Sequence, residues 1–233
     1  MTTHTSRLQD TLGLSAPPIA IGFSDEPPAG LERWQGGAVP AGCVFWREAM
    51  NGRSFYTVPA DHHNCAVGAH THGIGVPTSQ LEDTVKFMVS NEYLRIEEVA
   101  GIPTLEKTPA YISYGPAETA SFQYDLIVVA AKPAAGMLIY ESALRAGAGN
   151  ALANILGRPA CAVLPLVSKT GLASLSLGCM GNRTFTGLPD EELYVCIPSG
   201  HWSTVLTRST EIGRANSAMK QFYRNRQAQF AAS

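Results

Sequence analysis

The sequence predicts an α+β protein whose two β-rich halves, residues 1–115 and 116–233, carry flanking helices and pack as one compact unit. Short apolar and β-branched runs separated by Gly and Pro indicate strands and turns. A few longer segments place apolar residues at helical spacing. A strand, a turn and two cysteines occur in the same order in each half, which is typical of an internal repeat. With 233 residues, 45% of them hydrophobic, the chain is long enough to bury its own core.

The first half is expected to begin with a short helix over residues 4–12, where Thr5 serves as N-cap and Gly13 ends the pattern. A buried strand is expected over 19–23, closed by a turn that contains Pro27 and Pro28. The elements that follow are a short helix over 43–50, a strand over 53–58 and a glycine-containing loop over 61–77.

The most regular helix is predicted from residue 79 to residue 93. The segment from Ser79 to Glu82 has the sequence of a capping box. Apolar side chains then recur at helical spacing, at Leu81, Val85 and Met88.

In the second half, residues 124–131 are apolar and rich in β-branched side chains, which is typical of a central strand. Shorter strands are expected over 162–164 and 193–197, and another over 111–114 at the end of the first half. Helices are expected over 136–145 and over 210–230, the second of them amphipathic.

The internal repeat rests on paired segments. Ile19-Ala-Ile-Gly-Phe23 with Pro27-Pro-Ala-Gly-Leu31 resembles Ile127-Val-Val-Ala-Ala131 with Pro133-Ala-Ala-Gly-Met137. A first cysteine follows in each half, at Cys43 and Cys161, and a second cysteine beside glycine closes the pattern, at Cys65 and Cys179. If the halves pack about a pseudo-twofold axis, these four thiols converge on one site.

The same residues resemble the DUF169 family over most of the chain. The motifs that carry the resemblance are Cys43 with Ala49, Gly52 and Phe55, then Asn64-Cys65-Ala-Val-Gly68, Gly157-Arg158-Pro-Ala-Cys161, Ser176-Leu-Gly-Cys-Met-Gly-Asn-Arg183, and Glu191-Glu-Leu-Tyr194 before Ile197-Pro198. The resemblance implies that Cys43, Cys65, Cys161 and Cys179 occupy the recurring cysteine positions of the family, which has no settled reaction. Cys196 matches none of them and is expected to be a core residue.

The leading functional hypothesis is a redox or Lewis-acid protein with a four-cysteine metal site between the halves. Four thiolates suit a [4Fe–4S] cluster, and zinc is the alternative. Four of the six histidines lie between residues 62 and 72, so His70 and His72 are further candidate ligands. Two residues apart, they share one face if this segment is extended.

Two hypotheses without a metal stay open, and the sequence does not decide whether the protein is an enzyme. In the first, Cys65 is activated by His62 or His63, and Arg183 (with Arg158 as a second candidate) holds a small anionic substrate. In the second, the protein binds a small ligand or cofactor without turnover, in a cleft lined by aromatic residues, namely Trp34, Trp46, Trp202, Tyr56 and Tyr114.

Charge and hydropathy restrict the partners. The net charge of −2 provides no basic field for nucleic acid, and the longest apolar run, residues 126–131, is too short to span a membrane. The N-terminus has no signal-peptide pattern, which predicts a cytoplasmic protein. A charged content of only 15% favours a homo-oligomer. The expected partner is a small molecule or a redox partner.

Overall fold

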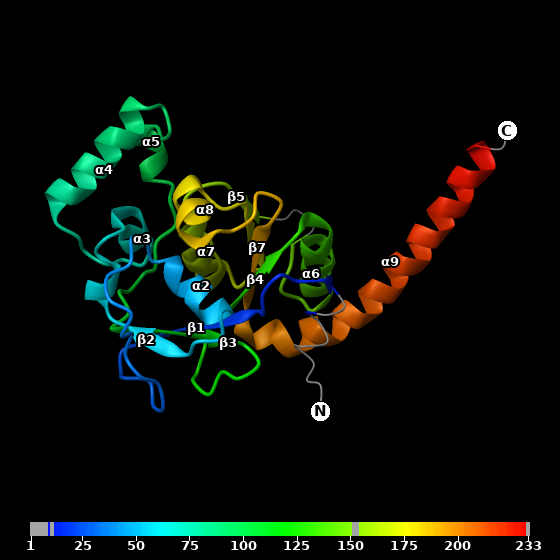
Figure 1. Cartoon of the computed structure of the whole chain (residues 1–233), viewed down its shortest axis with the longest axis horizontal. Helices are drawn as coiled ribbons and strands as arrows, with labels where there is room; N and C mark the ends of the chain where they lie inside the picture. The colour runs from blue at the N-terminus through cyan, green and yellow to red at the C-terminus, as the bar shows by residue number, and fades with distance from the viewer. Residues whose placement is uncertain (1–8, 10–11, 151–153, 232–233) are drawn as a thin grey trace.

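A seven-stranded sheet forms the centre of the molecule in the computed structural model, which describes residues 9, 12–150 and 154–231 (Figure 1). The strand order is β2-β3-β1-β4-β7-β6-β5, and the neighbouring strands are antiparallel except for the parallel pair β5–β6. The strands are β1 (Ile19–Ser24), β2 (Phe55–Thr57), β3 (Tyr111–Pro116), β4 (Leu126–Ala131), β5 (Asn154–Leu156), β6 (Ser174–Ser176) and β7 (Leu193–Pro198).

Helices cover both faces of this sheet. Their bounds are α2 (Val44–Met50), α3 (Ala66–Thr71), α4 (Thr78–Ser90), α5 (Ile96–Val99), α6 (Pro133–Arg145), α7 (Val163–Thr170), α8 (Met180–Thr186) and α9 (Trp202–Ala231), with short 3₁₀ turns η1 (Pro59–His62), η2 (Ala160–Ala162) and η3 (Ser199–His201). Strand β4 explains the arrangement, because its apolar side chains alternate between two cores. Leu126 and Val128 join the core beneath α2 and α7, whereas Ile127 and Val129 join the core beneath α6 and α9.

The predicted fold class is confirmed, since helices and a mixed sheet form one compact unit. Residues 1–115 supply β1, β2 and nearly all of β3, and the rest of the chain supplies β4 to β7; the two sets of strands meet where β1 pairs with β4. In both halves the order is strand, cysteine before a helix, short strand, cysteine beginning a helix, and strand. The duplication itself and the 1–115 and 116–233 boundaries stay predictions.

Most predicted elements are found, with two local corrections. Residues 162–164, expected as a strand, belong to η2 and the start of α7. The reason is that a short apolar run does not distinguish a buried strand from a buried helix. The expected loop over 61–77 contains the end of η1 and all of α3. The helix expected over 4–12 lies mostly outside the described residues.

Helix boundaries also differ from expectation. The helix α4 begins after Pro77, and no side chain caps it, so the Ser79–Glu82 capping box is not formed. The helix α9 begins at Trp202 rather than at residue 210, because Trp202 and Val205 are buried beside α6. Apolar contact with the sheet therefore extends this helix toward its N-terminus.

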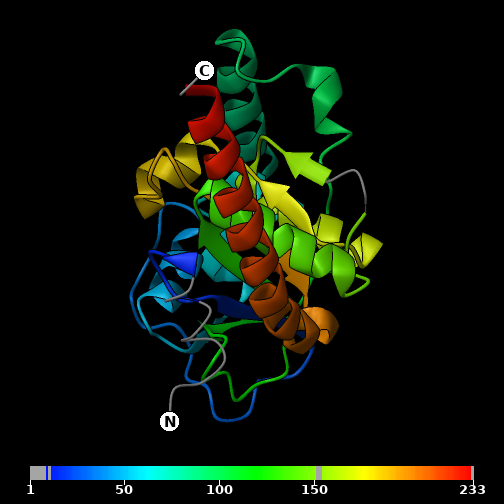
Figure 2. The ribbon, with the colours of Figure 1, turned by 90° about the vertical axis from the view of Figure 1, so that its right-hand side faces the viewer.

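Two elements project from the body of the protein. The α4–α5 pair lies at one end, and the second half of α9 extends from the other end as a lone helix (Figures 1 and 2). No residue of α4 or α5 is buried, and residues 217–231 of α9 are all exposed. Among the described residues, no helix has the length and apolar character needed to cross a membrane.

Candidate functional site

The five cysteines are free thiols on five different elements. Cys43 precedes α2, Cys65 begins α3, Cys161 lies in η2, Cys179 begins α8, and Cys196 lies in β7. Cys43 and Cys196 are buried in the core beneath α2 and α7, and Cys65 and Cys161 pack against that core. Cys196 is therefore a core residue, as expected.

Cys65 and Cys179 occupy equivalent local positions. Each is the N-cap of a short helix, and its Sγ atom accepts a hydrogen bond from the backbone N–H three residues later. The distance is 3.3 Å from Gly68 N to Cys65 Sγ and 3.4 Å from Asn182 N to Cys179 Sγ. Both residues are half-buried, so each thiol is held by a helix start and still reaches the surface.

Burial and mutual repulsion both act on the thiols. Burial raises the pKa of Cys43 to about 12, and Cys65 and Cys179 add smaller increases to it. Burial also raises the pKa of Cys65, and the nearby charge of Cys179 adds to this increase. Burial raises the pKa of Cys161 well above its usual range. The four thiols therefore lie within electrostatic range of one another, and a negative charge on one disfavours a charge on the others.

The predicted four-cysteine metal site is nevertheless wrong. The described residues include no group of three or more His, Cys, Asp or Glu side chains arranged to hold a metal ion. A metal site requires the sulfur atoms to converge at about 2.3 Å from one point. Here the thiols start from four separate elements, and two of them accept bonds from helix N–H groups instead. The predicted cofactor, a [4Fe–4S] cluster or zinc, required that convergence. Its identity stays a prediction.

The two candidate ligand histidines point in different directions. His70 lies in the last turn of α3 and His72 is its C-cap, so the segment is helical and residues two apart do not share a face. His72 is buried, and its Nδ1–H donates to the Gly68 carbonyl at 2.7 Å. Burial lowers the pKa of His72, which keeps the ring neutral and leaves Nε2 as an acceptor.

His62 is a second neutral histidine in the interior. Its Nε2 lies 2.9 Å from Thr57 Oγ1, and this hydroxyl donates to the Ile112 carbonyl at 3.4 Å. The other ring nitrogen of His62, Nδ1, is buried without a hydrogen-bond partner. Burial lowers the pKa of His62 well below its usual range, and repulsion from His72 and His63 adds to this.

Gly42 brings His62 and Cys65 into one neighbourhood. A Cβ atom at position 42 would lie 3.0 Å from His62 Nδ1, so the absence of a side chain permits the close approach. The Gly42 backbone N–H also lowers the pKa of Cys65 by hydrogen bonding. His63, which the sequence suggested as the base, is exposed, and its carbonyl accepts from Gln80 at 2.8 Å. His62, and not the exposed His63, is thus the histidine buried beside Gly42.

Further polar atoms line the same interior. Within the described ranges, four buried polar atoms have no hydrogen-bond partner, namely His62 Nδ1, His72 Nε2, Tyr114 OH and Asn182 Oδ1. The Asn182 side chain donates to Tyr194 OH at 3.3 Å and lowers the pKa of Cys43 by hydrogen bonding. Sequence reasoning missed Asn182, although its place three residues after Cys179 matches that of Gly68 after Cys65. Buried unpaired polar atoms are uncommon, so this interior is a candidate functional site.

Arg183 has a structural role beside Cys179. Its guanidinium donates to the carbonyls of Leu177 at 2.6 Å, Pro189 at 2.5 Å and Glu192 at 3.0 Å. These bonds tie the segment before Cys179 to the loop before β7. Its guanidinium is engaged by backbone rather than presented to solvent, so the structure supports Arg183 as a positioning residue for Cys179.

We expect Arg183→Lys to lower the free energy of unfolding by about 2–4 kcal/mol, because one ammonium group cannot serve three separated carbonyls. Urea unfolding followed by circular dichroism measures this change. The matched control is Arg214→Lys on the exposed face of α9, expected to stay within about 0.5 kcal/mol of wild type. Equal stability of the two variants would contradict the role given to Arg183.

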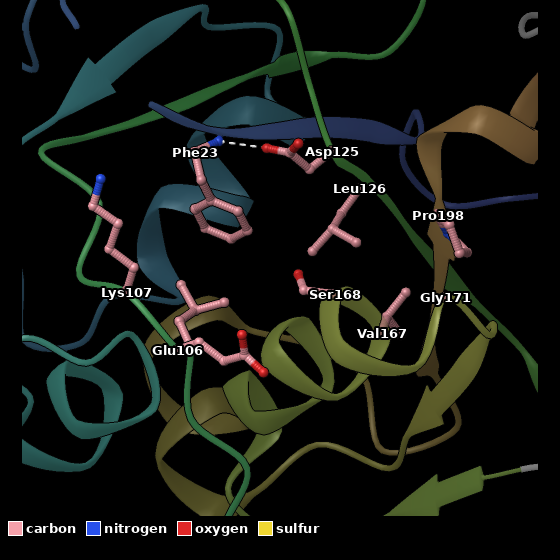
Figure 3. A pocket seen from close by; sticks show the side chains of 10 residues that line it. Phe23, Glu106, Lys107, Asp125, Leu126, Val167, Ser168, Gly171 and Pro198 are labelled. Carbon is pink, nitrogen blue, oxygen red and sulfur yellow. Dashed lines mark hydrogen bonds between the residues drawn. The ribbon is translucent and has the colours of Figure 1, made fainter. Parts of the chain in front are cut away.

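A surface pocket of about 360 Å³ is lined by residues of β1, β4 and α7 and of the segments before β3 and β4 (Figure 3). The Phe23 ring points into it and stands edge-on to the His72 ring, with 6.4 Å between centroids. The carboxylates of Asp125 and Glu106 face it from opposite sides, while Lys107 extends away and pairs with Asp25. This pocket suits a small molecule with a positively charged or hydrogen-bond-donating group.

The aromatic residues suggested as a ligand cleft are mostly core residues. Trp34, Trp46 and Tyr114 are buried beneath α2, and Trp202 is buried in the opposite core. Tyr56 packs edge-on against Tyr111 with 5.5 Å between ring centroids. Large aromatic side chains bury more apolar area than any others, which explains why they fill the core.

Comparison with family models identifies one family. The model of the DUF169 family, described as "Uncharacterised ArCR, COG2043", matches residues 7–208. The "Uncharacterized protein MJ0308" of Methanocaldococcus jannaschii is 24% identical over 205 residues, which cover 84% of this chain and 87% of that protein. No solved structure matches the chain.

Proposed function

The chain belongs to the DUF169 family, and we propose that it is a metal-independent thiol–disulfide redox protein that works through Cys179 and Cys65. The observation that supports the proposal is that two free thiols, Cys65 and Cys179, cap two short helices in the same way. Cys43 and Cys161 have strongly raised pKa values and stay protonated. Cys65 and Cys179, half-buried at two helix starts, are the pair left for exchange.

Access favours Cys179 as the thiol that reacts first. The side chains around it are exposed and apolar, with exposed fractions of 47% for Leu177, 63% for Met180 and 47% for Phe185. An apolar surface around a thiol suits docking of a disulfide substrate or a redox partner protein. Cys65 lies deeper, against the core, and is suited to resolve the first product.

The reaction balances with a disulfide as oxidant. Cys179 loses its proton to water, and the thiolate attacks one sulfur of RS–SR, which forms a mixed disulfide and releases RS⁻. Cys65 then loses its proton to water, and its thiolate attacks Cys179 Sγ. The mixed disulfide breaks, the second RS⁻ leaves, and both leaving groups take up protons. Two electrons pass from the two thiols to the substrate.

The charge of Cys179 determines when Cys65 ionises during the two exchange steps. A negative Cys179 raises the pKa of Cys65, so both thiols are not ionised together. When Cys179 enters the mixed disulfide its charge disappears, and this contribution to the pKa of Cys65 is removed. The resolving thiol therefore ionises more readily only after the first exchange has taken place.

Arg158 supports an anionic substrate. Its guanidinium lies 4.5 Å from the centre of the Tyr93 ring, and Tyr93 OH accepts from the backbone N–H of Met180 at 3.4 Å. The exposed Arg158 is therefore linked through the Tyr93 side chain to Met180, the residue that follows Cys179. We infer that a small disulfide bearing carboxylates is the preferred substrate.

The free thiols, the net charge and the exposed apolar side chains support a proposal for location and assembly. Free thiols suit the cytoplasm, where low-molecular-weight thiols keep cysteines reduced. The small net charge favours a disulfide or a protein partner over nucleic acid. Exposed apolar side chains outside the site favour a homo-oligomer.

A redox titration tests the proposed function. The protein is equilibrated in glutathione buffers of graded potential, the remaining thiols are alkylated, and disulfide-linked peptides are identified by mass spectrometry. The expected result is one reversible Cys65–Cys179 link, with five free thiols falling to three. The control variant Cys196→Ala, altered in the core strand, is expected to form the same link. Five free thiols at the most oxidising potential, or a link between other cysteines, would overturn the proposal.

We expect Arg158→Gln to reduce the rate with oxidised glutathione, which is anionic, by about 2–5-fold, since an exposed charge contributes about 0.2–1 kcal/mol. The rate with cystamine, a cationic disulfide, is expected to stay equal or rise. Stopped-flow thiol kinetics at low and high salt measure both rates. An equal loss with both disulfides would show that Arg158 acts on the fold and not on substrate charge.

A further inference from the structure

The exposed half of α9 carries a stripe of apolar side chains that are open to solvent. The buried side of the helix follows the spacing of Val205, Ser209 and Ile212, and the same spacing continues through Met219 and Tyr223. In the exposed half, large apolar side chains have exposed fractions of 46% at Met219, 50% at Phe222, 62% at Tyr223 and 71% at Phe230. The helix continues past the body (Figure 1), and the spacing of the face that packs on α6 continues with it. Exposed apolar patches of this kind mark interaction surfaces.

The charge of this segment restricts what can cover it. Residues 213–231 contain four basic side chains, Arg214, Lys220, Arg224 and Arg226, and no acidic one. Pairing of α9 with α9 from another copy would bring like charges together, which is unfavourable. The stripe therefore suits an apolar surface with acidic surroundings.

Such a surface lies at the opposite end of the same protein. In α4–α5 the exposed fractions are 70% for Phe87, 38% for Val89 and 62% for Ile96. Residues 78–99 contain five acidic side chains, Glu82, Asp83, Glu92, Glu97 and Glu98, against two basic ones, Lys86 and Arg95. No residue of these two helices is buried, so the pair can accept a helix along its outer face.

We propose that the exposed half of α9 docks on the α4–α5 pair of a second copy of this chain. The two elements project from opposite ends of the molecule (Figure 1), so two copies side by side and antiparallel bring both contacts together at once. The contact is made twice in such a twofold dimer, and no docking surface remains open. The proposal specifies the surface of the homo-oligomer proposed above and does not depend on the thiol chemistry.

Charge reversal with complementation tests this surface in the full-length protein. One variant carries Lys220→Glu with Arg224→Glu on α9, and the other carries Asp83→Lys with Glu97→Lys on α4–α5. Each is expected to weaken self-association at least tenfold in sedimentation velocity, because each repels its own partner surface. Mixed in equal amounts, they are expected to form a heterodimer near wild-type affinity, since one contact is wild type and the other has both charges reversed.

A control on the body of the protein distinguishes a specific effect at this surface from a general effect of charge. A double reversal on the body, Arg47→Glu with Lys169→Glu, is expected to leave association unchanged, and Phe222→Ser is expected to weaken it at least tenfold. Thermal melts confirm that each variant is folded. A wild type that stays monomeric at high protein concentration would overturn self-association altogether. A wild type that associates, together with variants that associate equally well or are not rescued by mixing, would overturn only this surface.

Discussion

Replacing Cys65 by serine is expected to stop the redox reaction half-way and leave a stable mixed disulfide on Cys179. Cys179 still attacks the substrate, but no thiol at position 65 remains to release the second leaving group. The expected intact mass after oxidation is that of the protein with one substrate thiol attached. Cys179→Ser is expected to lower the rate of reaction with the disulfide by at least about 100-fold, since the raised pKa values of Cys43, Cys65 and Cys161 make those thiols poor nucleophiles.

Two variants separate this role from a general effect on thiols. Cys43→Ala and Cys196→Ala are expected to form the Cys65–Cys179 disulfide as the wild type does, because neither thiol takes part in the exchange. A mixed disulfide found at Cys43 or Cys161 in the Cys65→Ser variant would reverse the assignment of Cys179 as first nucleophile. Rapid loss of the attached thiol from that variant would assign the resolving step to another cysteine.

Mild acid is expected to destabilise the fold through its two buried neutral histidines. Burial lowers the pKa of both His62 and His72 below the usual value of 6.5. Below that value the unfolded chain binds protons that the folded chain does not, so the free energy of unfolding decreases as the pH falls. Each histidine contributes at most about 1.4 kcal/mol per pH unit, which gives a loss of about 2–4 kcal/mol between pH 7 and pH 5.

Urea unfolding at pH 7, 6 and 5 measures this loss, in a range above the titration of ordinary carboxylates. His62→Gln is expected to remove about half of the pH dependence, whatever its effect on stability at pH 7. His63→Gln, at an exposed position next to it, is expected to keep the wild-type dependence. A flat profile in the wild type would mean that the two histidines bind protons in the folded protein as readily as in the unfolded chain, and would contradict their burial as neutral rings.

Regular elements could be predicted because their side-chain pattern is set locally. Strands β1, β4 and β7 are apolar runs buried on both faces, and α6 and α9 show helical spacing over many residues. The short elements around the thiols were not predictable in the same way. Helix α3 has six residues and α7 has eight, and the packing of these short segments against the sheet decided their conformation.

The candidate site likewise has features that the sequence predicted and features that packing decided. The repeated sequence pattern indicated four cysteines as candidate site residues, and local composition indicated the histidine-rich segment after Asp61. It did not reveal which way the side chains point. The helical conformation of α3 separates His70 from His72, and the carbonyls around Arg183 engage a side chain that the sequence offered as a substrate clamp.

By itself, then, the sequence determined the fold class, the central strands, the family and the identity of the thiols, because these depend on composition and on patterns within short segments. Only the tertiary structure decided that the thiols lie on separate elements without a metal site among the described residues, that His62 rather than His63 is buried beside Gly42, and that α9 leaves the body with its apolar stripe exposed. Those features depend on the directions of side chains on elements far apart in the chain. Such directions are set when the sheet and its two helical layers pack together.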